Sequence, residues 1–129
     1  MRQIALCLAA ATLGMTAAMA DEPAKKMETS AGEVYVDQDG MTLYTFDKDA
    51  MGATMSACTD KCLANWPPFQ AGEGAMADGE WAIVEYTDTD GAVKNMWAYE
   101  GKPLYLYVED KKPGDVMGDG KGGVWHVAK

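Results

Sequence analysis

Two cysteines and two methionines are the residues whose types and spacing best suit chemistry in this sequence. Cys58 and Cys62 lie four positions apart, and Met51, Met55 and Cys58 follow one another at intervals of four and three. In a helical segment the four sulfur atoms would lie along one side, and such soft ligands favour Cu(I). If oxidised, the cysteines would instead form a disulfide that closes a small loop and stabilises the fold by about 2 kcal/mol.

The N-terminus favours the disulfide. A short apolar run and an Ala-Met-Ala motif before Asp21 predict a signal peptide, residues 1–20, cleaved after Ala20. Cleavage leaves Cys58 and Cys62 as the only cysteines, and an even number in an oxidising compartment favours pairing. We therefore expect a periplasmic or secreted protein with this disulfide and no transmembrane segment. Copper binding is the alternative, and it requires both thiols to be reduced.

His126 is the only histidine, so the sequence offers little for catalysis. It would join Met51, Met55, Cys58 and Cys62 in a metal site only if the fold brought it to them. A lone histidine in a terminal strand is more often an ordinary surface residue. Without a second histidine there is no nucleophilic triad, and no Gly-rich phosphate loop leads from a strand into a helix. We expect no enzyme, no catalytic residue and no resident cofactor, with copper as the alternative.

The balance of charge excludes some partners. The full chain has a net charge of −9, and loss of Arg2 with the signal peptide leaves ten lysines against twenty acids, a net charge near −10. Such a chain repels nucleic acid and anionic lipid. The remaining length fits one small domain, residues 32–129, after a polar stretch, 21–31, that we expect to be a flexible leader. We expect a monomer with an unknown envelope or periplasmic partner.

The chain contains an internal repeat. The segment DGMTLYTFDKD (39–49) aligns with EGKPLYLYVED (100–110) at a constant offset of 61, and a tryptophan follows each copy, Trp66 and Trp125. Four identical and two chemically similar positions within eleven indicate two copies of one structural unit. Repeat one covers 32–69, a Gly- and Ala-rich connector covers 70–80, and repeat two covers 81–129.

The pattern within each copy is that of strands. Short runs rich in Val, Tyr, Trp and Thr alternate with turns, which predicts a mainly β fold, a small antiparallel domain. The predicted strands are 33–36, 41–46, 81–86, 92–99, 103–108 and 124–128. The Asp-Gly pairs at 39–40 and 90–91 predict two tight hairpins. A short helix is expected around the cysteines, capped by Ser56 and ended by Pro67.

The repeated motifs resemble those of the secreted-repeat family of predicted bacterial lipoproteins, named for a Yx(F/W/Y)xxD motif. The matching residues are Tyr44, Phe46 and Asp49 in one copy, Tyr105, Tyr107 and Asp110 in the other, Cys58-x-x-x-Cys62-x-x-x-Trp66-Pro-Pro, and Pro113-Gly-Asp-x-x-Gly before Trp125. The resemblance implies a secreted or periplasmic β-rich module of two repeats. It implies no function and no catalytic residues. No cysteine lies at the cleavage site, so we expect no lipid anchor.

The motif aromatics allow two interpretations. We expect them to form the core, because large aromatics must provide much of the burial in a domain this small; they are Tyr44, Phe46, Trp66, Tyr105, Tyr107 and Trp125. The other interpretation is that they line a groove for a sugar, a peptide or a quinone-like ring. The expected function is a non-catalytic binding or accessory module. Its alternatives are a copper-binding or electron-transfer accessory and a carbohydrate- or envelope-binding module.

Overall fold

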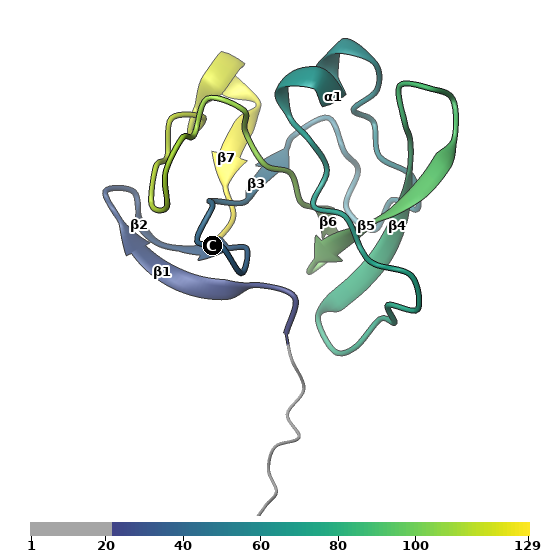
Figure 1. Ribbon diagram of the computed structural model, residues 1–129, viewed down its shortest axis with the longest axis horizontal. Coiled ribbons are helices and arrows are strands. Elements are labelled where there is room, and N and C mark those ends of the chain that lie inside the picture. The colour runs from purple at the N-terminus through teal and green to yellow at the C-terminus, as the bar shows by residue number, and fades with distance from the viewer. Residues whose placement is uncertain (1–21) are drawn as a thin grey trace, which may run out of the picture.

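The structure of the protein is a computed structural model that describes residues 22–129 (Figure 1). The predicted signal peptide and its cleavage site lie outside these residues. No helix between Glu22 and Lys129 is long and apolar enough to cross a membrane.

The described chain is built of short antiparallel strands. The elements are β1 (Lys25–Thr29), β2 (Gly32–Val36), β3 (Tyr44–Phe46), α1 (Lys61–Asn65), β4 (Trp81–Thr87), β5 (Val93–Tyr99), β6 (Lys102–Pro103), the 3-10 turn η2 (Lys121–Gly123) and β7 (Trp125–Val127). They form three small sheets, ordered β1-β2, β3-β7 and β4-β5-β6. The predicted mainly β, antiparallel fold is therefore confirmed.

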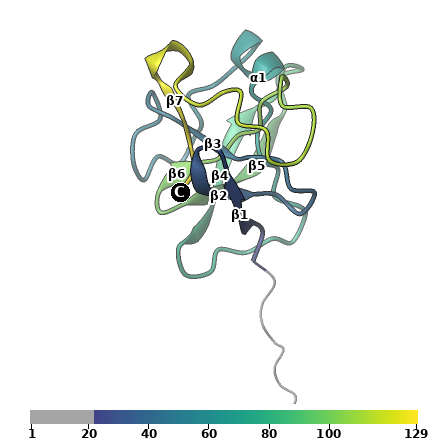
Figure 2. The ribbon, with the colours of Figure 1, turned by 90° about the vertical axis from the view of Figure 1, so that its left-hand side faces the viewer.

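The hairpins of the two repeats lie on opposite sides of a shared centre, but other elements cross over: Figure 1 shows α1 of the first repeat on the β4–β5 side and β7 of the second on the β1–β2 side. Hairpin β1–β2 lies at the start of the first copy and begins before its predicted boundary at residue 32, and β4–β5 begins the second copy; Figure 1 shows these hairpins flanking β3, β6 and β7. Figure 2 views the same arrangement from the β1–β2 side. Strand β3 of the first copy pairs with β7 of the second, Tyr44 opposite Val127. The β3–β7 sheet therefore joins the two copies, whereas each of the other two sheets lies within one copy.

The two predicted Asp-Gly turns are present and share one geometry. In each, the amide of the first aspartate donates to the carbonyl four residues later, at 2.9 Å in 37–41 and 2.7 Å in 88–92. The glycine of each turn has a φ of +88°, a left-handed conformation that glycine adopts without steric cost. Both hairpin predictions are confirmed.

The prediction of a flexible leader at 21–31 is wrong for most of that segment. Lys25–Thr29 forms β1, which pairs along its whole length with β2, and Ala24 is buried. The sequence pattern did not indicate this strand, because β1 pairs on one side only and its lysines and Glu28 face solvent. The segment therefore lacks the alternation of apolar and polar residues that indicates a strand.

Two predicted strands are much shorter than expected. The strand predicted at 103–108 ends at Pro103, and the one predicted at 41–46 begins at Tyr44. The Leu104 amide still donates to the Trp97 carbonyl of β5, and the chain then crosses to the first repeat, where Tyr105 bridges both Tyr44 and Pro68. Leu104 and Tyr105 are fully buried, so this part of the segment is covered on both sides although it is not a regular strand.

The helix also starts later than predicted. α1 begins at Lys61, and Ser56 does not cap it. The Ser56 hydroxyl instead accepts a 3.0 Å hydrogen bond from the Cys58 amide and lies 2.5 Å from the Tyr105 hydroxyl. A serine beside a buried tyrosine gains more from these bonds than from a solvent-exposed cap. The helix ends before Pro67, as predicted.

The buried side chains form two clusters. The larger cluster contains residues of both repeats, among them Val34, Tyr44, Tyr86, Tyr105 and Trp125. A smaller cluster lies between β2 and β4–β5, and partly exposed aromatic rings pack against it. The predicted connector, 70–80, is an irregular segment whose first residues pair with β5 through the Ala71 amide and the Asn95 carbonyl. It borders the smaller cluster.

Candidate functional site

The repeated Tyr and Asp residues bind each other across the two copies. The Tyr44 hydroxyl donates to Asp110 at 2.6 Å, and the Tyr105 hydroxyl donates to Asp49 at 2.7 Å. The backbones of Tyr44 and Tyr105 also exchange two N–H to carbonyl hydrogen bonds, of 2.8 and 2.9 Å. Each motif therefore supplies the tyrosine for one pair and the aspartate for the other.

The second oxygen of each carboxylate fixes a loop. Asp49 accepts the amide of Ala57 at 2.6 Å, and Asp110 accepts the amide of Met117 at 2.8 Å. Burial raises the pKa of both carboxyls above the usual range. Burial and the hydrogen bond to the neighbouring carboxylate also raise the pKa of Tyr44 and of Tyr105 well above that of a free tyrosine. The four side chains serve as internal hydrogen-bonding partners, a structural role.

Four aromatic rings of the motifs form one continuous stack. Phe46 lies on Trp125 (centroids 4.1 Å apart, planes at 11°), Trp125 on Trp66 (3.8 Å, 4°), and Trp66 on Tyr107 (4.1 Å, 17°). The rings alternate between the first and the second repeat. Both tryptophans are buried, as the core interpretation predicted. The stack thus interleaves the two copies.

The second glycine of the Pro-Gly-Asp-x-x-Gly motif, Gly118, packs directly against the aromatic stack. A Cβ atom on Gly118 would lie 2.6 Å from the ring of Trp66 and 2.9 Å from that of Tyr107. The Gly118 amide also donates to the Tyr44 hydroxyl at 3.1 Å. Only glycine lets the backbone approach the stack so closely.

The sequence comparison agrees with this two-copy geometry. A family model described as a secreted repeat of unknown function matches residues 25–70 and 86–129. The chain belongs to this secreted-repeat family. The matched segments begin in β1 and at the end of β4, so the family repeat includes the strand that was predicted to be a flexible leader. No curated protein and no solved structure gives a significant match.

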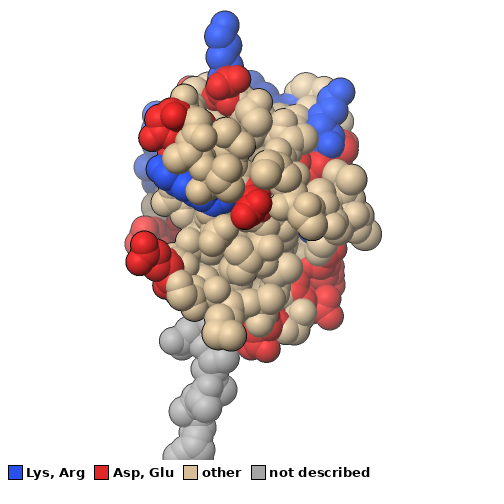
Figure 3. All heavy atoms as spheres, turned by 90° about the vertical axis from the view of Figure 1, so that its right-hand side faces the viewer, with Lys and Arg blue, Asp and Glu red and all other residues tan. Residues whose placement is uncertain are grey.

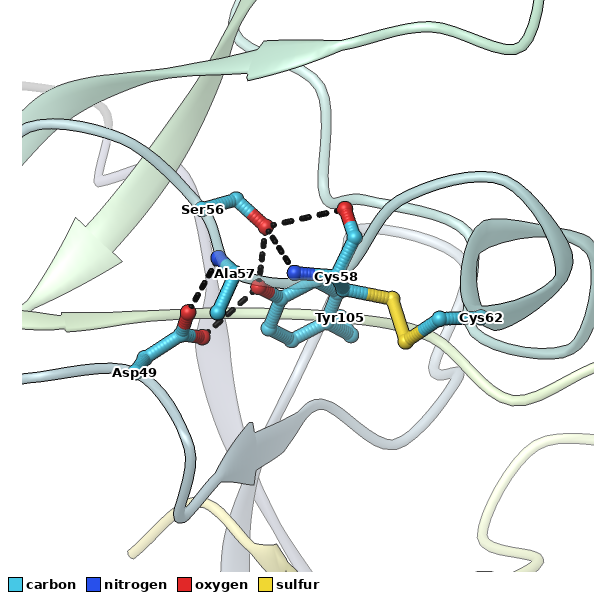
Figure 4. The surroundings of a disulfide bond; sticks show 6 residues. All are labelled: Asp49, Ser56, Ala57, Cys58, Cys62 and Tyr105. Atoms are coloured by element: carbon cyan, nitrogen blue, oxygen red, sulfur yellow. Dashed lines mark hydrogen bonds between the residues drawn. A yellow bond between two sulfur atoms is a disulfide. The ribbon is translucent and has the colours of Figure 1, made fainter.

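The predicted disulfide is present in this member of the secreted-repeat family. Cys58 and Cys62 are bonded, with a sulfur–sulfur distance of 1.98 Å. Figure 4 shows the bond beside the ring of Tyr105, next to the hydrogen bonds of Ser56 and Asp49. Cys58 is fully buried. The bond therefore ties the start of α1 to the core.

The structure does not assemble the predicted copper ligands. The disulfide removes both thiolates, and the side chains of Met51 and Met55 lie on the surface, 70% and 42% exposed. His126 lies in β7, where its Nε2 is 2.8 Å from a carboxylate oxygen of Asp47. Between Glu22 and Lys129, no three His, Cys, Asp or Glu side chains cluster as a metal site. Copper binding by the reduced protein stays a prediction.

A groove lies elsewhere, between the β1–β2 hairpin and the sheet that contains β4 and β5. It has a volume of about 1430 Å³, and five aromatic residues line it: Tyr35, Phe69, Trp81, Trp97 and Tyr99. Tyr35 and Trp81 are nearly covered, whereas the other three are partly exposed. We call this set of residues the aromatic groove. On the side of the molecule that carries β4 and β5, uncharged side chains form a broad area with acidic groups around it (Figure 3).

Strand pairing and one side-chain hydrogen bond position the groove aromatics. Trp81 lies directly opposite Tyr99 in the β4–β5 register, and Trp97, two residues before Tyr99, shares its face. The Tyr35 and Tyr99 hydroxyls share a 2.9 Å hydrogen bond, and this bond together with burial raises the pKa of Tyr99 to about 12. The bond also links β2 to β5. The aromatic groove is therefore built from both repeats.

The aromatic groove could not be predicted from the repeated motifs, because its aromatic residues lie outside them. Tyr35, Phe69, Trp81, Trp97 and Tyr99 do not belong to the Yx(F/W/Y)xxD segments. One signal was available: Trp97 and Tyr99 are two positions apart in a predicted strand, which places two large aromatics on one face. Their partner Tyr35 could not be found in this way, because only the fold brings it to them.

Proposed function

We propose that this protein is an exported, non-catalytic binding module whose ligand site is the aromatic groove. The observation that carries the proposal is a groove of about 1430 Å³ with five aromatic residues along it. Binding pockets combine apolar and aromatic walls with a few polar groups, and this groove has both. The family description as a secreted repeat agrees with an exported protein.

Packing of the core accounts for Tyr35 and Trp81, which are buried, but not fully for Phe69, Trp97 and Tyr99, which stay partly exposed. Tyr44 and Tyr105 are completely buried, and both stacked tryptophans are nearly so. Trp97 and Tyr99, by contrast, retain access to water after folding. Leaving apolar ring surface in water forgoes about 25 cal/mol per Å², so a cluster of partly exposed rings is a candidate ligand surface.

A catalytic role finds little support in the same geometry. The buried titratable side chains, Asp49, Asp110, Tyr44 and Tyr105, hydrogen-bond one another and lie outside the groove. His126 is also absent from the groove lining. The groups best suited to acid–base chemistry are therefore separated from the surface best suited to bind a ligand.

The proposal is tested by NMR of the four indole N–H groups. Trp81 and Trp97 line the aromatic groove, whereas Trp66 and Trp125 lie in the core stack, so the protein contains its own control. The ¹⁵N-labelled protein is titrated with soluble peptidoglycan fragments, maltohexaose and small organic cations. A ligand of this site shifts the two groove indoles and leaves the two stacked indoles in place.

Substitution then locates the binding surface. Trp97→Ala removes a partly exposed groove ring, and the proposal predicts at least a tenfold loss of affinity. Met51→Ala is the control, because Met51 is exposed and lies outside the groove. Equal affinity of the wild type and Trp97→Ala for the bound ligand would refute the groove as its site.

A further inference from the structure

We infer that the aromatic groove recognises an organic ammonium group, such as the quaternary ammonium of choline. This inference rests on the proposed function, and it names the chemical class of the ligand. It depends on the exposed ring surface along the groove, on a lysine of the protein itself, and on the acidic side chains along the groove.

The groove rings stand at large angles to one another. The plane of Trp81 is at 86° to that of Tyr35, 82° to that of Trp97 and 48° to that of Tyr99. The core combines both arrangements, because its stacked planes are within 4° to 17° of each other and Tyr105 stands at 89° to Trp125. The groove rings pack against one another, and Trp97 and Tyr99 keep ring surface exposed along the groove, where an aromatic face attracts a quaternary ammonium group.

A cationic side chain of the protein already lies over the face of one of these rings. The ammonium nitrogen of Lys26, in β1, is 5.1 Å from the centroid of the Tyr35 ring. This distance is within the range at which the ring quadrupole attracts a cation. The Tyr35 ring is held by its hydroxyl bond to Tyr99. Lys26 therefore marks a position in the groove where an ammonium group is favourable.

The charges along the groove include carboxylates without a cationic partner. Glu22, Asp78 and Glu80 line it, and none of the ion pairs within 22–129 includes them. The basic side chains of the groove, Lys25 and Lys26, both come from β1. A ligand cation would be drawn to the acids that precede β4, and the net charge of −9 raises the concentration of cations near the protein.

Lys26 and a ligand ammonium would compete for the same ring. The Lys26→Met variant keeps an unbranched side chain but loses the charge, so it should bind the cation more tightly than the wild type. An exposed cation–π contact corresponds to a factor of roughly three in affinity. Lys61→Met is the control, because Lys61 is exposed on α1, outside the groove.

The test compares choline with 3,3-dimethylbutan-1-ol, which has the same shape and no charge. Both are titrated into the full chain, followed by calorimetry and by the indole N–H signals of Trp81 and Trp97. The groove is larger than one headgroup, so choline serves as a probe of the recognised group. We expect choline to bind about tenfold more tightly than the alcohol, Lys26→Met to bind it about threefold more tightly still, and Lys61→Met to match the wild type.

Each other outcome overturns the inference in a recognisable way. Equal affinity for choline and the alcohol would show an apolar site, and the proposed binding function would stand. If maltohexaose shifts Trp81 and Trp97 while choline does not, the ligand class is wrong and the groove is right. If no member of the panel, choline included, shifts the two groove indoles, both the inference and the proposed function fail.

Discussion

The hydroxyl of Tyr44 donates a 2.6 Å hydrogen bond to Asp110, a residue of the other copy of the repeat. Tyr105 and Asp49 form the corresponding bond in the opposite direction. The Yx(F/W/Y)xxD motif therefore describes one half of a reciprocal contact. Its tyrosine and its aspartate each form a hydrogen bond to a residue of the other copy, so neither copy forms the contact alone.

Loss of a motif hydroxyl should destabilise the protein. Tyr105→Phe leaves a carboxylate oxygen of the half-buried Asp49 without its donor and removes the contact with Ser56, which should cost about 1–3 kcal/mol of unfolding free energy. Tyr107→Phe is the control, because its hydroxyl makes no hydrogen bond within 22–129, and it should cost less than about 0.5 kcal/mol. Urea denaturation measures both. Equal costs would contradict the structural role of the Tyr105 hydroxyl.

The buried carboxyls should make the effect of mutation depend on pH. Burial raises the pKa of Asp110 above its unfolded value of about 3.9, so folding favours the protonated acid. The stabilisation from this group is complete below about pH 3.9 and is lost as the pH rises through the raised pKa. Asp110→Asn does not titrate, so it should cost more stability at pH 3.5 than at pH 7.

Urea midpoints of the wild type and Asp110→Asn at the two pH values provide the measurement. Asp49→Asn should change in the same direction, because burial raises the pKa of that carboxyl too. A larger cost at pH 7 than at pH 3.5 for either variant would show that the carboxylate, and not the acid, is favoured by the fold.

Gly118 should tolerate no side chain. A methyl group there would lie 2.6 Å from Trp66, so Gly118→Ala should force the stack apart and cost about 1–3 kcal/mol. Gly72→Ala is the control, because nothing lies within 4 Å of its Cβ position. Thermal unfolding followed by near-ultraviolet circular dichroism reports both stability and the stacked rings. A Gly118→Ala protein as stable as Gly72→Ala would rule out the close approach.

The disulfide should stabilise the fold without being essential to it. Its loop is short, so the double variant Cys58→Ala/Cys62→Ala should lose about 2 kcal/mol and remain folded. Reduction of the wild type should give the same loss. Denaturant midpoints measure the difference. If the reduced, folded protein also binds copper stoichiometrically, that result would support the soft-metal alternative, which the oxidised structure does not support.

Much of the architecture follows from local sequence. The Asp-Gly pairs at 39–40 and 90–91 fixed two turns, because few other residues accept that backbone. The offset of 61 between Tyr44 and Tyr105 identified the two copies correctly. Local patterns succeed here because the turn and the strand are each determined by a few neighbouring residues.

The relationships between the copies could not be predicted. Nothing in the sequence states whether Tyr44 binds Asp49 of its own copy or Asp110 of the other, since the two aspartates have the same local motif. Strand β1 was missed because an outer strand of a small sheet can be polar on most positions. Ser56 was assigned to a helix cap because its actual partner, Tyr105, is distant in sequence.

A double-mutant cycle on Tyr44 tests the reciprocal contact most directly. Tyr44→Phe is combined with Asp110→Asn in one cycle and with Asp49→Asn in the other, and the unfolding free energies are measured in urea. The account predicts a coupling energy of about 1 kcal/mol or more with Asp110 and a value near zero with Asp49. Coupling of Tyr44 to Asp49 instead of Asp110 would contradict the exchange of partners between the two repeats.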